Sequence, residues 1–227
     1  MLVKYWMSRD PVVVDAEESM RQATDLMKNH NIRMLPVMRK NKIVGVITDR
    51  DLKRASASDA TTLEIHELLY LLSKIKVADI MSKPAVCVQL DQTIEETAEI
   101  LMRRKISGAP VVADNGELRG LITQHDLFRA LISLTGVQGR GLHIALILED
   151  RPGSIMEIAN LIRELGGRTV SILTSFNRCQ EGYRRVYFRI YRMEREKVDR
   201  LLAQIRDRAQ LLYLVDHREN RREIYME

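Results

Sequence analysis

The sequence predicts a mixed α/β (α+β) fold in which two similar units form a pseudo-symmetric pair and a third unit of different pattern follows. Apolar residues make up 45% of the 227 residues, which is enough to build substantial cores. The first 135 residues match one another at an offset that drifts between 73 and 75. Three glycines between residues 136 and 141 mark a boundary. We therefore expect units at 1–58 and 77–135, a linker helix at 59–76, a linker at 136–141, a different domain at 142–218 and a tail at 219–227.

Composition and charge narrow the class of protein. No apolar run reaches the roughly 18 to 20 residues of a membrane span, and the N-terminal residues lack the pattern of a signal peptide, so we expect a cytoplasmic protein with no membrane partner. Cys87 and Cys179 show no metal or disulfide spacing. The net charge is +5, and the arginines of the C-terminal part are interleaved with acids, as in YRMEREKVDR. Such interleaving favours a solvated surface, so we do not expect a nucleic-acid partner.

The internal repeat is carried by short matching motifs. MSRDP at 7–11 matches MSKP at 81–84, IRMLPV at 32–37 matches ISGAPV at 106–111, and GVITDRDL at 45–52 matches GLITQHDL at 120–127. Between these motifs, Ala23, Leu26 and Met27 align with Ala98, Leu101 and Met102 at an offset of 75. Offsets that change only in loops are expected of two copies of one folded unit.

Each copy has the pattern of a strand, a helix, two strands and a second helix. SMRQATDLMKNH and TIEETAEILMRR carry apolar residues at helical spacing, and KIVGVIT and ELRGLIT have the composition of strands. Asn115-Gly116 predicts a tight hairpin in the second copy because both residues accept positive φ, whereas the first copy predicts a looser turn. Leucines near helical spacing predict that residues 59–76 form a linker helix.

Both copies place a Thr-x-x-Asp sequence where a strand runs into a helix, as Thr48 with Asp51 and as Thr123 with Asp126. This spacing is close to that of a capping box, so the two residues could simply start the helix. A hydroxyl and a carboxylate at a helix start could also bind a ribose, because a carboxylate accepts hydrogen bonds from vicinal hydroxyls and helix amides favour phosphate. The same pair can cap and bind.

Together, the motifs of residues 1–135 resemble a pair of cystathionine-β-synthase (CBS) motifs, a Bateman module. The resemblance implies a cleft between the units that binds an adenosyl ligand such as AMP, ADP, ATP or S-adenosylmethionine as a regulatory ligand. It also implies that Asp51 and Asp126 hold ribose hydroxyls, while Thr48 and Thr123 contact phosphate or ribose.

The resemblance implies further contacts at less specific positions. Arg33 corresponds to a basic phosphate contact of the family, and its counterpart in the second copy is the uncharged Ser107. We expect Arg33 to lie beside the first Thr–Asp pair, which makes the two clefts unequal. His125 could contact a phosphate or simply be a surface residue. Plain core packing is the alternative for the expected pocket walls, which are Val12, Val13, Met34, Pro36, Val86, Val88 and Pro110.

The C-terminal part has the order βαββαβ, which predicts a ferredoxin-like antiparallel sheet with two helices on one face. The segment DRPGS before its first helix resembles the opening loop of an ACT domain. That family often binds an amino acid, here implying contacts from Asp150, Pro152, Gly153, Ser154 and Thr169. Thr169 stands where many ligand-binding members have Asn, and the alternative for the loop is a strand-to-helix turn capped by Asp150.

The order of two CBS units and one ACT unit is similar to that of bacterial acetoin-utilisation proteins of the AcuB type. The five histidines lie in separate elements and outside known catalytic spacings, and there is no phosphate-binding P-loop. We therefore expect a non-enzymatic regulatory sensor, a homodimer that acts on a protein target whose identity the sequence leaves open. The alternatives are an assembly module without a ligand, or an amino-acid sensor that works through the ACT unit alone.

Overall fold

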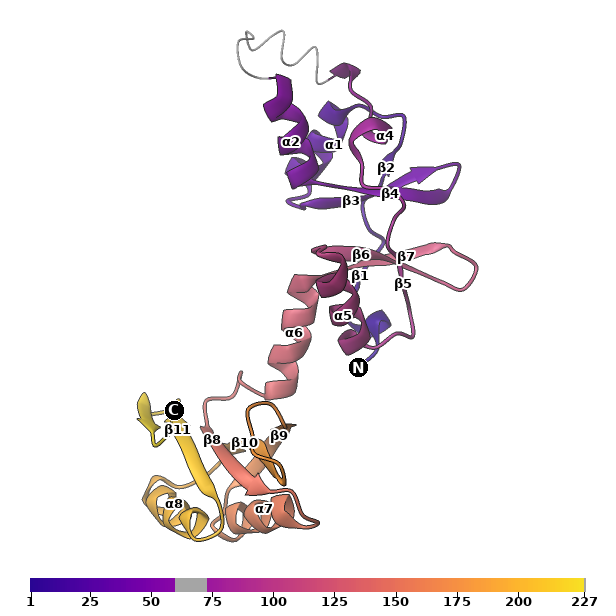
Figure 1. The fold of residues 1–227 in the computed structure, drawn as a ribbon. Coiled ribbons are helices and arrows are strands. Elements are labelled where there is room, and N and C mark those ends of the chain that lie inside the picture. Colours follow the sequence, from indigo (N-terminus) through magenta and orange to yellow (C-terminus); the bar gives the residue numbers. More distant parts are fainter. Residues whose placement is uncertain (60–72, 227) are drawn as a thin grey trace. The chain divides into compact units, whose positions relative to one another are not determined.

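The computed structural model describes residues 1–59 and 73–226, and the chain divides into two compact units, Met1–Phe128 and Arg129–Glu227 (Figure 1). Most of the predicted linker helix, residues 59–76, lies outside the described residues. None of the described helices is long and apolar enough to cross a membrane.

The first unit contains both sequence repeats, and each repeat shows the predicted order of a strand, a helix, two strands and a helix. The repeats form two small sheets, with strand orders β2-β3-β4 and β1-β7-β6-β5. In the first repeat the elements are η1 (Val3–Tyr5), β1 (Ser8–Arg9), β2 (Val14–Asp15), α1 (Met20–Asn29), β3 (Met34–Arg39), β4 (Lys42–Thr48) and α2 (Asp49–Asp59). In the second they are α4 (Val77–Ile80), β5 (Val88–Gln89), α5 (Ile94–Arg104), β6 (Gly108–Val112), β7 (Leu118–Thr123) and α6 (Gln124–Thr135).

The helix caps fix the alignment of the two repeats. Ser19 starts α1 and Thr93 starts α5, each in a capping box with the side chain three residues later. These caps are 74 residues apart, so Met27 corresponds to Leu101, and both side chains are buried. Met102, by contrast, is 77% exposed. The predicted alignment of the helices at an offset of 75 is therefore wrong by one residue.

The hairpin turns are opposite to the sequence prediction. In the first repeat Arg39 pairs with Lys42, and Lys40 and Asn41 between them have φ of 50° and 60°, a two-residue turn. In the second repeat Gly116 has φ of 79° and its N–H donates to the carbonyl of Ala113 at 2.8 Å, within a longer loop. The offset changes from 74 to 75 at this loop, and the extra residue explains why the second turn is the wider one.

The two repeats exchange their N-terminal segments. The N–H of Val3 donates to the carbonyl of Gln92 at 2.9 Å in the second repeat, and Val3 is fully buried there. Reciprocally, the N–H of Val77 donates to the carbonyl of Glu18 at 2.9 Å, and Val77 belongs to the core of the first repeat. Because this exchange is a long-range event, the local sequence pattern gives no sign of it.

Each exchanged segment crosses the opposite sheet at a glycine. A Cβ atom at Gly45 would lie 2.6 Å from the Met81 sulfur and 2.8 Å from the carbonyl oxygen of Ser82. A Cβ atom at Gly120 would lie 2.6 Å from the Met7 sulfur and 2.6 Å from the carbonyl oxygen of Ser8. The glycine of each G-V/L-I-T motif therefore makes room for the Met-Ser of the other repeat.

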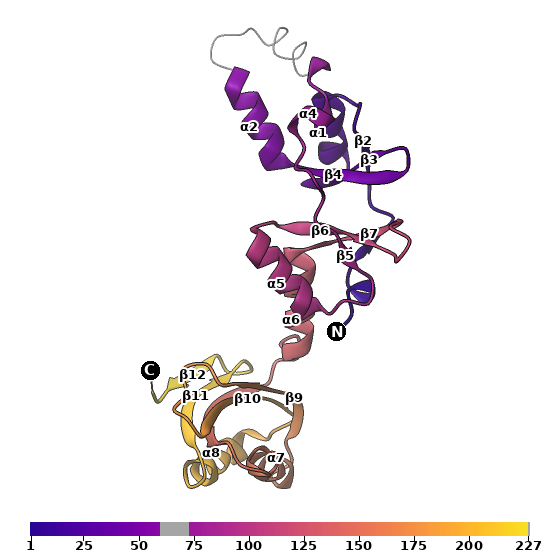
Figure 2. The same cartoon turned by 45° about the vertical axis from the view of Figure 1, so that its right-hand side comes forward.

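The second unit has the predicted βαββαβ order, with one added strand. Its sheet has the strand order β12-β11-β8-β10-β9, all neighbours antiparallel, and α7 and α8 lie on one face (Figure 2). Residues 219–227, expected to be a tail, contribute strand β12, which pairs with β11. The elements are β8 (Leu142–Glu149), α7 (Ser154–Glu164), β9 (Arg168–Ser175), β10 (Tyr183–Tyr191), η2 (Arg195–Lys197), α8 (Val198–Arg206), β11 (Gln210–Asp216) and β12 (Arg221–Ile224).

The segment expected to be a linker, 136–141, is bound to the sheet of the second unit. Tyr191 donates its hydroxyl proton to the carbonyl of Gly136 and accepts a hydrogen bond from the N–H of Gly139 at 2.8 Å. Ser171 donates to the carbonyl of Thr135 at 3.0 Å. Thr135 at the end of α6 and the glycine-rich residues 136–141 are thus held against this sheet, and we call this segment the strap.

Candidate functional site

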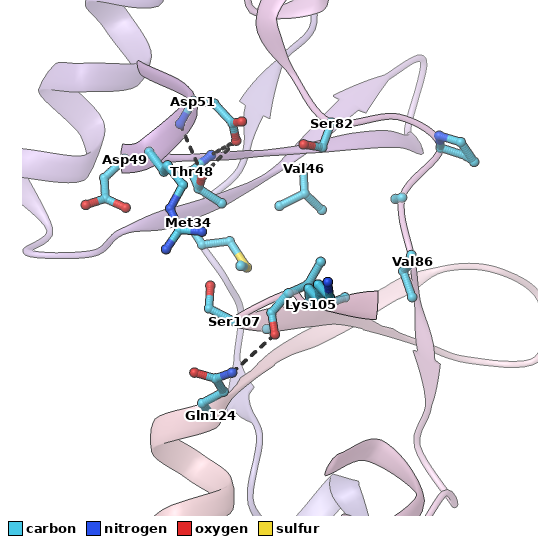
Figure 3. Close-up of a pocket in the computed structure, with 15 residues that line it drawn as sticks. Met34, Val46, Thr48, Asp49, Asp51, Ser82, Val86, Lys105, Ser107 and Gln124 are labelled. Carbon is cyan, nitrogen blue, oxygen red and sulfur yellow. Dashed lines mark hydrogen bonds between the residues drawn. The ribbon is translucent and has the colours of Figure 1, made fainter. Parts of the chain in front are cut away.

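The described residues of the first unit enclose a cavity of about 290 Å³ between the two repeats (Figure 3). Thr48 and Asp51 lie on one side, Ser107 and Gln124 lie on the other, and the Met34 side chain reaches between them. The walls come from the ends of β3 and β4, the start of α2, the exchanged segment after α4, and the turn between α5 and β6. The lining residues are Met34, Val46, Thr48, Asp49, Arg50, Asp51, Ser82, Pro84, Ala85, Val86, Lys105, Ile106, Ser107, Gly108 and Gln124.

Thr48 and Asp51 cap the helix and line the cavity at once. The carboxylate oxygen Oδ2 of Asp51 accepts from the Thr48 hydroxyl at 2.7 Å and from the Thr48 N–H at 3.0 Å. The other oxygen, Oδ1, accepts from Arg54 Nη2 at 3.0 Å. Asp51 is only 7% exposed, so its carboxylate is held in one orientation at the cavity wall.

The remaining lining residues divide into apolar and polar groups. Met34, Val46 and Val86 give apolar surface that suits a flat aromatic ring. Arg50 and Lys105 bring two cations, one from each repeat, and such groups bind phosphate or carboxylate. A cavity with a buried carboxylate, apolar walls and two cations has the groups needed for a ribose, a base and an anionic substituent.

The second Thr–Asp pair has the same local geometry. Thr123 donates to Asp126 Oδ2 at 2.7 Å through its hydroxyl and at 2.9 Å through its N–H, and Asp126 is 5% exposed. Strand pairing confirms that the two sites are equivalent, because Thr48 is paired with Met34 and Thr123 with Gly108. The repeat thus provides two related positions for a carboxylate at a helix start.

Arg33 is not among the residues that line the cavity beside Thr48 and Asp51, whereas its counterpart Ser107 is. The backbone of Arg33 does lie beside the first Thr–Asp pair, because its carbonyl accepts a hydrogen bond from the N–H of Asp49 at 3.0 Å. The phosphate contact expected of Arg33 stays a prediction.

A family model for the CBS domain matches residues 3–58 and 77–133. Residues 3–133 of this chain are a tandem CBS domain pair. Inosine-5′-monophosphate dehydrogenase of Korarchaeum cryptofilum is 36% identical over 120 residues, a match that covers 53% of this chain and 22% of the dehydrogenase. A CBS domain-containing protein of Dictyostelium discoideum is 29% identical over 135 residues, covering 59% of this chain and 93% of that protein. The chain therefore spans about a fifth of the dehydrogenase and most of the smaller relative.

Solved structures of CBS pairs are similar to this first unit. The CBS pair of protein MJ0100, in complex with 5′-methylthioadenosine and S-adenosyl-L-methionine, is 26% identical with a TM-score of 0.51, covering 61% of this chain and 98% of that chain. The CBS-pair protein CBSX2 from Arabidopsis thaliana is 28% identical with a TM-score of 0.50, covering 60% of this chain and 96% of that chain.

The other predicted site residues of the CBS pair lie in several environments. Met34 and Val86 line the cavity as expected. Val88 is buried in the sheet, and Pro36 and Pro110 are buried strand residues paired with Val46 and Leu121. Val12 packs on the core of the first repeat, Val13 is 40% exposed, and His125 is an exposed residue of α6 at the position of Arg50. None of these last six residues lines the described cavity.

Sequence reasoning missed several lining residues of the CBS pair. Lys105 follows α5 in a left-handed conformation with φ of 55°, and Ser82 and Pro84 belong to the exchanged segment. The pairing of MSRDP with MSKP marked that segment, but its position on the opposite repeat was needed to place it at the cavity. Among the described residues, no group of His, Cys, Asp and Glu is arranged to hold a metal ion.

The residues predicted for a ligand in the second unit do not come together. Asp150 forms an ion pair with Arg184 and does not cap α7, whose N-cap is Gly153 with φ of 89°. Pro152 is exposed in the loop, and Ser154 is buried with its hydroxyl oxygen unpaired. Thr169 pairs with Ile190, which pairs with Leu142, whereas Asp150 follows the other end of β8. Thr169 therefore lies at the opposite end of the sheet from the other four.

Proposed function

We propose that the CBS pair is a regulatory sensor for a small adenosyl ligand. The observation that carries the proposal is the cavity that places Asp51, held by Thr48, against apolar walls and two cations from both repeats. The similar pair of MJ0100 binds 5′-methylthioadenosine and S-adenosyl-L-methionine, which supports an adenosyl group. The cavity of about 290 Å³ lies just below the range of roughly 300 to 1,000 Å³ that is usual for small-molecule sites. It suits a nucleoside or a nucleoside monophosphate better than a triphosphate.

Ligand binding regulates when it favours one of two conformations. The cavity walls belong to both repeats, so a bound ligand bridges them and stabilises the arrangement in which both walls contact it. A ligand with equal affinity for both arrangements would change nothing. We therefore expect the output to be a change in the relation of the repeats that a protein target recognises.

Isothermal titration calorimetry tests the proposal with 5′-methylthioadenosine, AMP, ATP and S-adenosylmethionine. Asp51→Ala removes a charged hydrogen-bond acceptor worth about 1.5–3 kcal/mol, so the dissociation constant should rise roughly 10-fold to 150-fold. Asp114→Ala, in the exposed hairpin turn, is the matched control and should leave the affinity unchanged. Thermal melting without ligand separates the loss of the helix cap, about 0.5–2 kcal/mol, from the loss of binding. Absence of binding by the wild type at millimolar concentration would refute the proposal in favour of an assembly module.

For the second unit we propose an ACT domain that joins two copies of the chain. The βαββαβ order and the DRPG loop between β8 and α7 support this assignment. Because the expected amino-acid contacts are divided between two ends of the sheet, the favoured role is association. Sedimentation of the full chain should give a dimer, and a panel of amino acids should leave its melting temperature unchanged. A monomer that is stabilised by one amino acid would instead support the sensor role.

A further inference from the structure

The sheet of the second unit has one face covered by α7 and α8 (Figure 2). On its other face the strap of Thr135 and residues 136–141 lies over Ser171 and Tyr191, beside Arg189, and leaves β8, β11 and β12 uncovered by it. Alternation along β10 puts Val186, Phe188 and Ile190 under the helices, where they are fully buried. The alternate residues of β10, which include Arg185, Tyr187 and Arg189, therefore point to the other face. We call this other face the open face.

Aromatic rings cluster on the three neighbouring strands β10, β8 and β11 of the open face. His143 lies with its ring centroid 5.4 Å from Tyr213, edge to face, and 6.3 Å from Tyr187. All three side chains are partly exposed. Burial and the neighbouring Arg189 lower the pKa of His143 to about 4, so this ring is neutral at pH 7. Neutral, partly exposed rings on central strands are the kind of surface on which nucleobases stack.

The charged residues of the open face are almost all basic. Arg185 and Arg189 lie on β10, and Arg222 lies on β12 where it pairs with Val215. Arg189 is 5% exposed, and its Nε and Nη1 atoms have no hydrogen-bond partner. Among the described strand residues of this face the acid is Glu149, at the end of β8 and in an ion pair with Arg151 at 3.2 Å. Arg185 and Arg222 are less buried than Arg189, so they are the cations of this face that an anion can reach.

We propose that the open face binds single-stranded nucleic acid, with bases on Tyr187, Tyr213 and His143 and the phosphates near Arg185 and Arg222. Four-stranded βαββαβ sheets can bind single-stranded RNA in this way, through aromatic residues on central strands, and the analogy is one of fold and surface chemistry. A second copy is a poorer occupant, because a two-fold contact between open faces would set arginine against arginine. This basic surface could not be predicted from the sequence, in which basic and acidic residues are interleaved. It forms because Arg185 and Arg189 are alternate residues of one strand and so lie on the same face of the sheet.

The test is fluorescence anisotropy with a labelled single-stranded oligouridylate and the full chain at about 50 mM salt, where such contacts are strong. We expect a dissociation constant of roughly 1–100 μM, weakening as salt rises. Arg185→Glu with Arg222→Glu should raise it at least about 10-fold and flatten the salt dependence. Tyr187→Ala should raise it roughly 5-fold to 150-fold, the value of one stacked base.

The control pair is Arg163→Glu with Arg200→Glu, two exposed residues of α7 and α8 that change the net charge by the same amount. It should retain most of the binding, and circular dichroism should show that all variants fold. An equal loss in the control pair would overturn the proposal, because binding would then follow net charge alone. So would equal affinity for duplex RNA, absence of binding by the wild type, or binding of polyglutamate in place of the oligonucleotide.

Discussion

Gly45→Ala should destabilise the CBS pair by forcing the exchanged segment away from β4. The new Cβ atom would lie 2.8 Å from the carbonyl oxygen of Ser82, while nonpolar contacts require about 3.5 Å, so the backbone must retreat by roughly 0.7 Å. That movement strains two hydrogen bonds between Val46 and Ser82, of 3.0 and 2.9 Å.

Overpacking of this kind costs about 1–3 kcal/mol, and a weakened hydrogen bond adds about 0.5–1.5 kcal/mol. Alanine also lowers the conformational entropy of the unfolded chain relative to glycine, which offsets about 0.4–1 kcal/mol of this destabilisation. The net loss of about 0.5–4 kcal/mol corresponds to a fall in melting temperature of roughly 1–16 °C for a chain of this size. Ligand affinity should fall too, because Ser82 and Pro84 line the cavity.

Differential scanning calorimetry measures the melting temperature, and calorimetric titration measures the affinity. Gly120→Ala, which meets Met7 and Ser8 in the same way, should give a similar loss of stability. Lys42→Ala, an exposed position of the same strand, should stay within about 0.5 kcal/mol of the wild type. A melting temperature of Gly45→Ala equal to that of Lys42→Ala would show that the crossing is loosely packed and would refute the reasoning.

Three further predictions concern single features of the fold. Ser19→Ala and Thr93→Ala each remove the side-chain half of a capping box and should cost about 0.5–2 kcal/mol in urea unfolding, with Ser133→Ala, an exposed position inside α6, as the control. Folding lowers the pKa of His143 from 6.5 to about 4, so as the pH falls the imidazole is protonated in the unfolded chain before it is protonated in the folded one. The free energy of unfolding should therefore decrease as the pH falls from about 6.5 to about 4. His143→Gln should reduce that loss, and an unchanged pH profile of the melting temperature would count against it. Tyr191→Phe removes the hydroxyl that holds Gly136 and Gly139, so trypsin should cleave after Arg140 faster than in the wild type, and an equal rate would contradict the role of the strap.

Local features of the fold were predictable from the sequence because they depend on neighbouring residues. The order of elements in both repeats and the βαββαβ order follow from periodicity and turn residues. The strap and strand β12 were missed because glycine-rich and charged segments carry little periodicity. The one-residue error in the helix alignment arose because Leu101 and Met102 are both apolar, and only burial distinguishes them.

The candidate site was predictable at its repeated motif and not beyond it. Thr48 and Asp51 stand in a local pattern, and the cavity contains both. The places of Lys105 and Ser82 at the cavity depend on which repeat faces which. That relation is set by long-range contacts such as those of Val3 with Gln92 and of Val77 with Glu18, 89 and 59 positions apart in the sequence. For the same reason, Thr169 and Asp150 could be matched to a motif but not placed at one end of the sheet.

The exchange of N-terminal segments bears on how such a chain could arise. Each repeat carries at its own start the segment that its neighbour requires, with Val3 completing one core and Val77 the other. A protein with a single repeat would be incomplete alone, yet two copies could complete each other by domain swapping. The tandem chain is thus equivalent to a swapped dimer whose subunits have been fused after gene duplication. After such a fusion the two sites can change independently, and in this chain they differ at the equivalent positions Arg33 and Ser107, and Asp49 and Gln124.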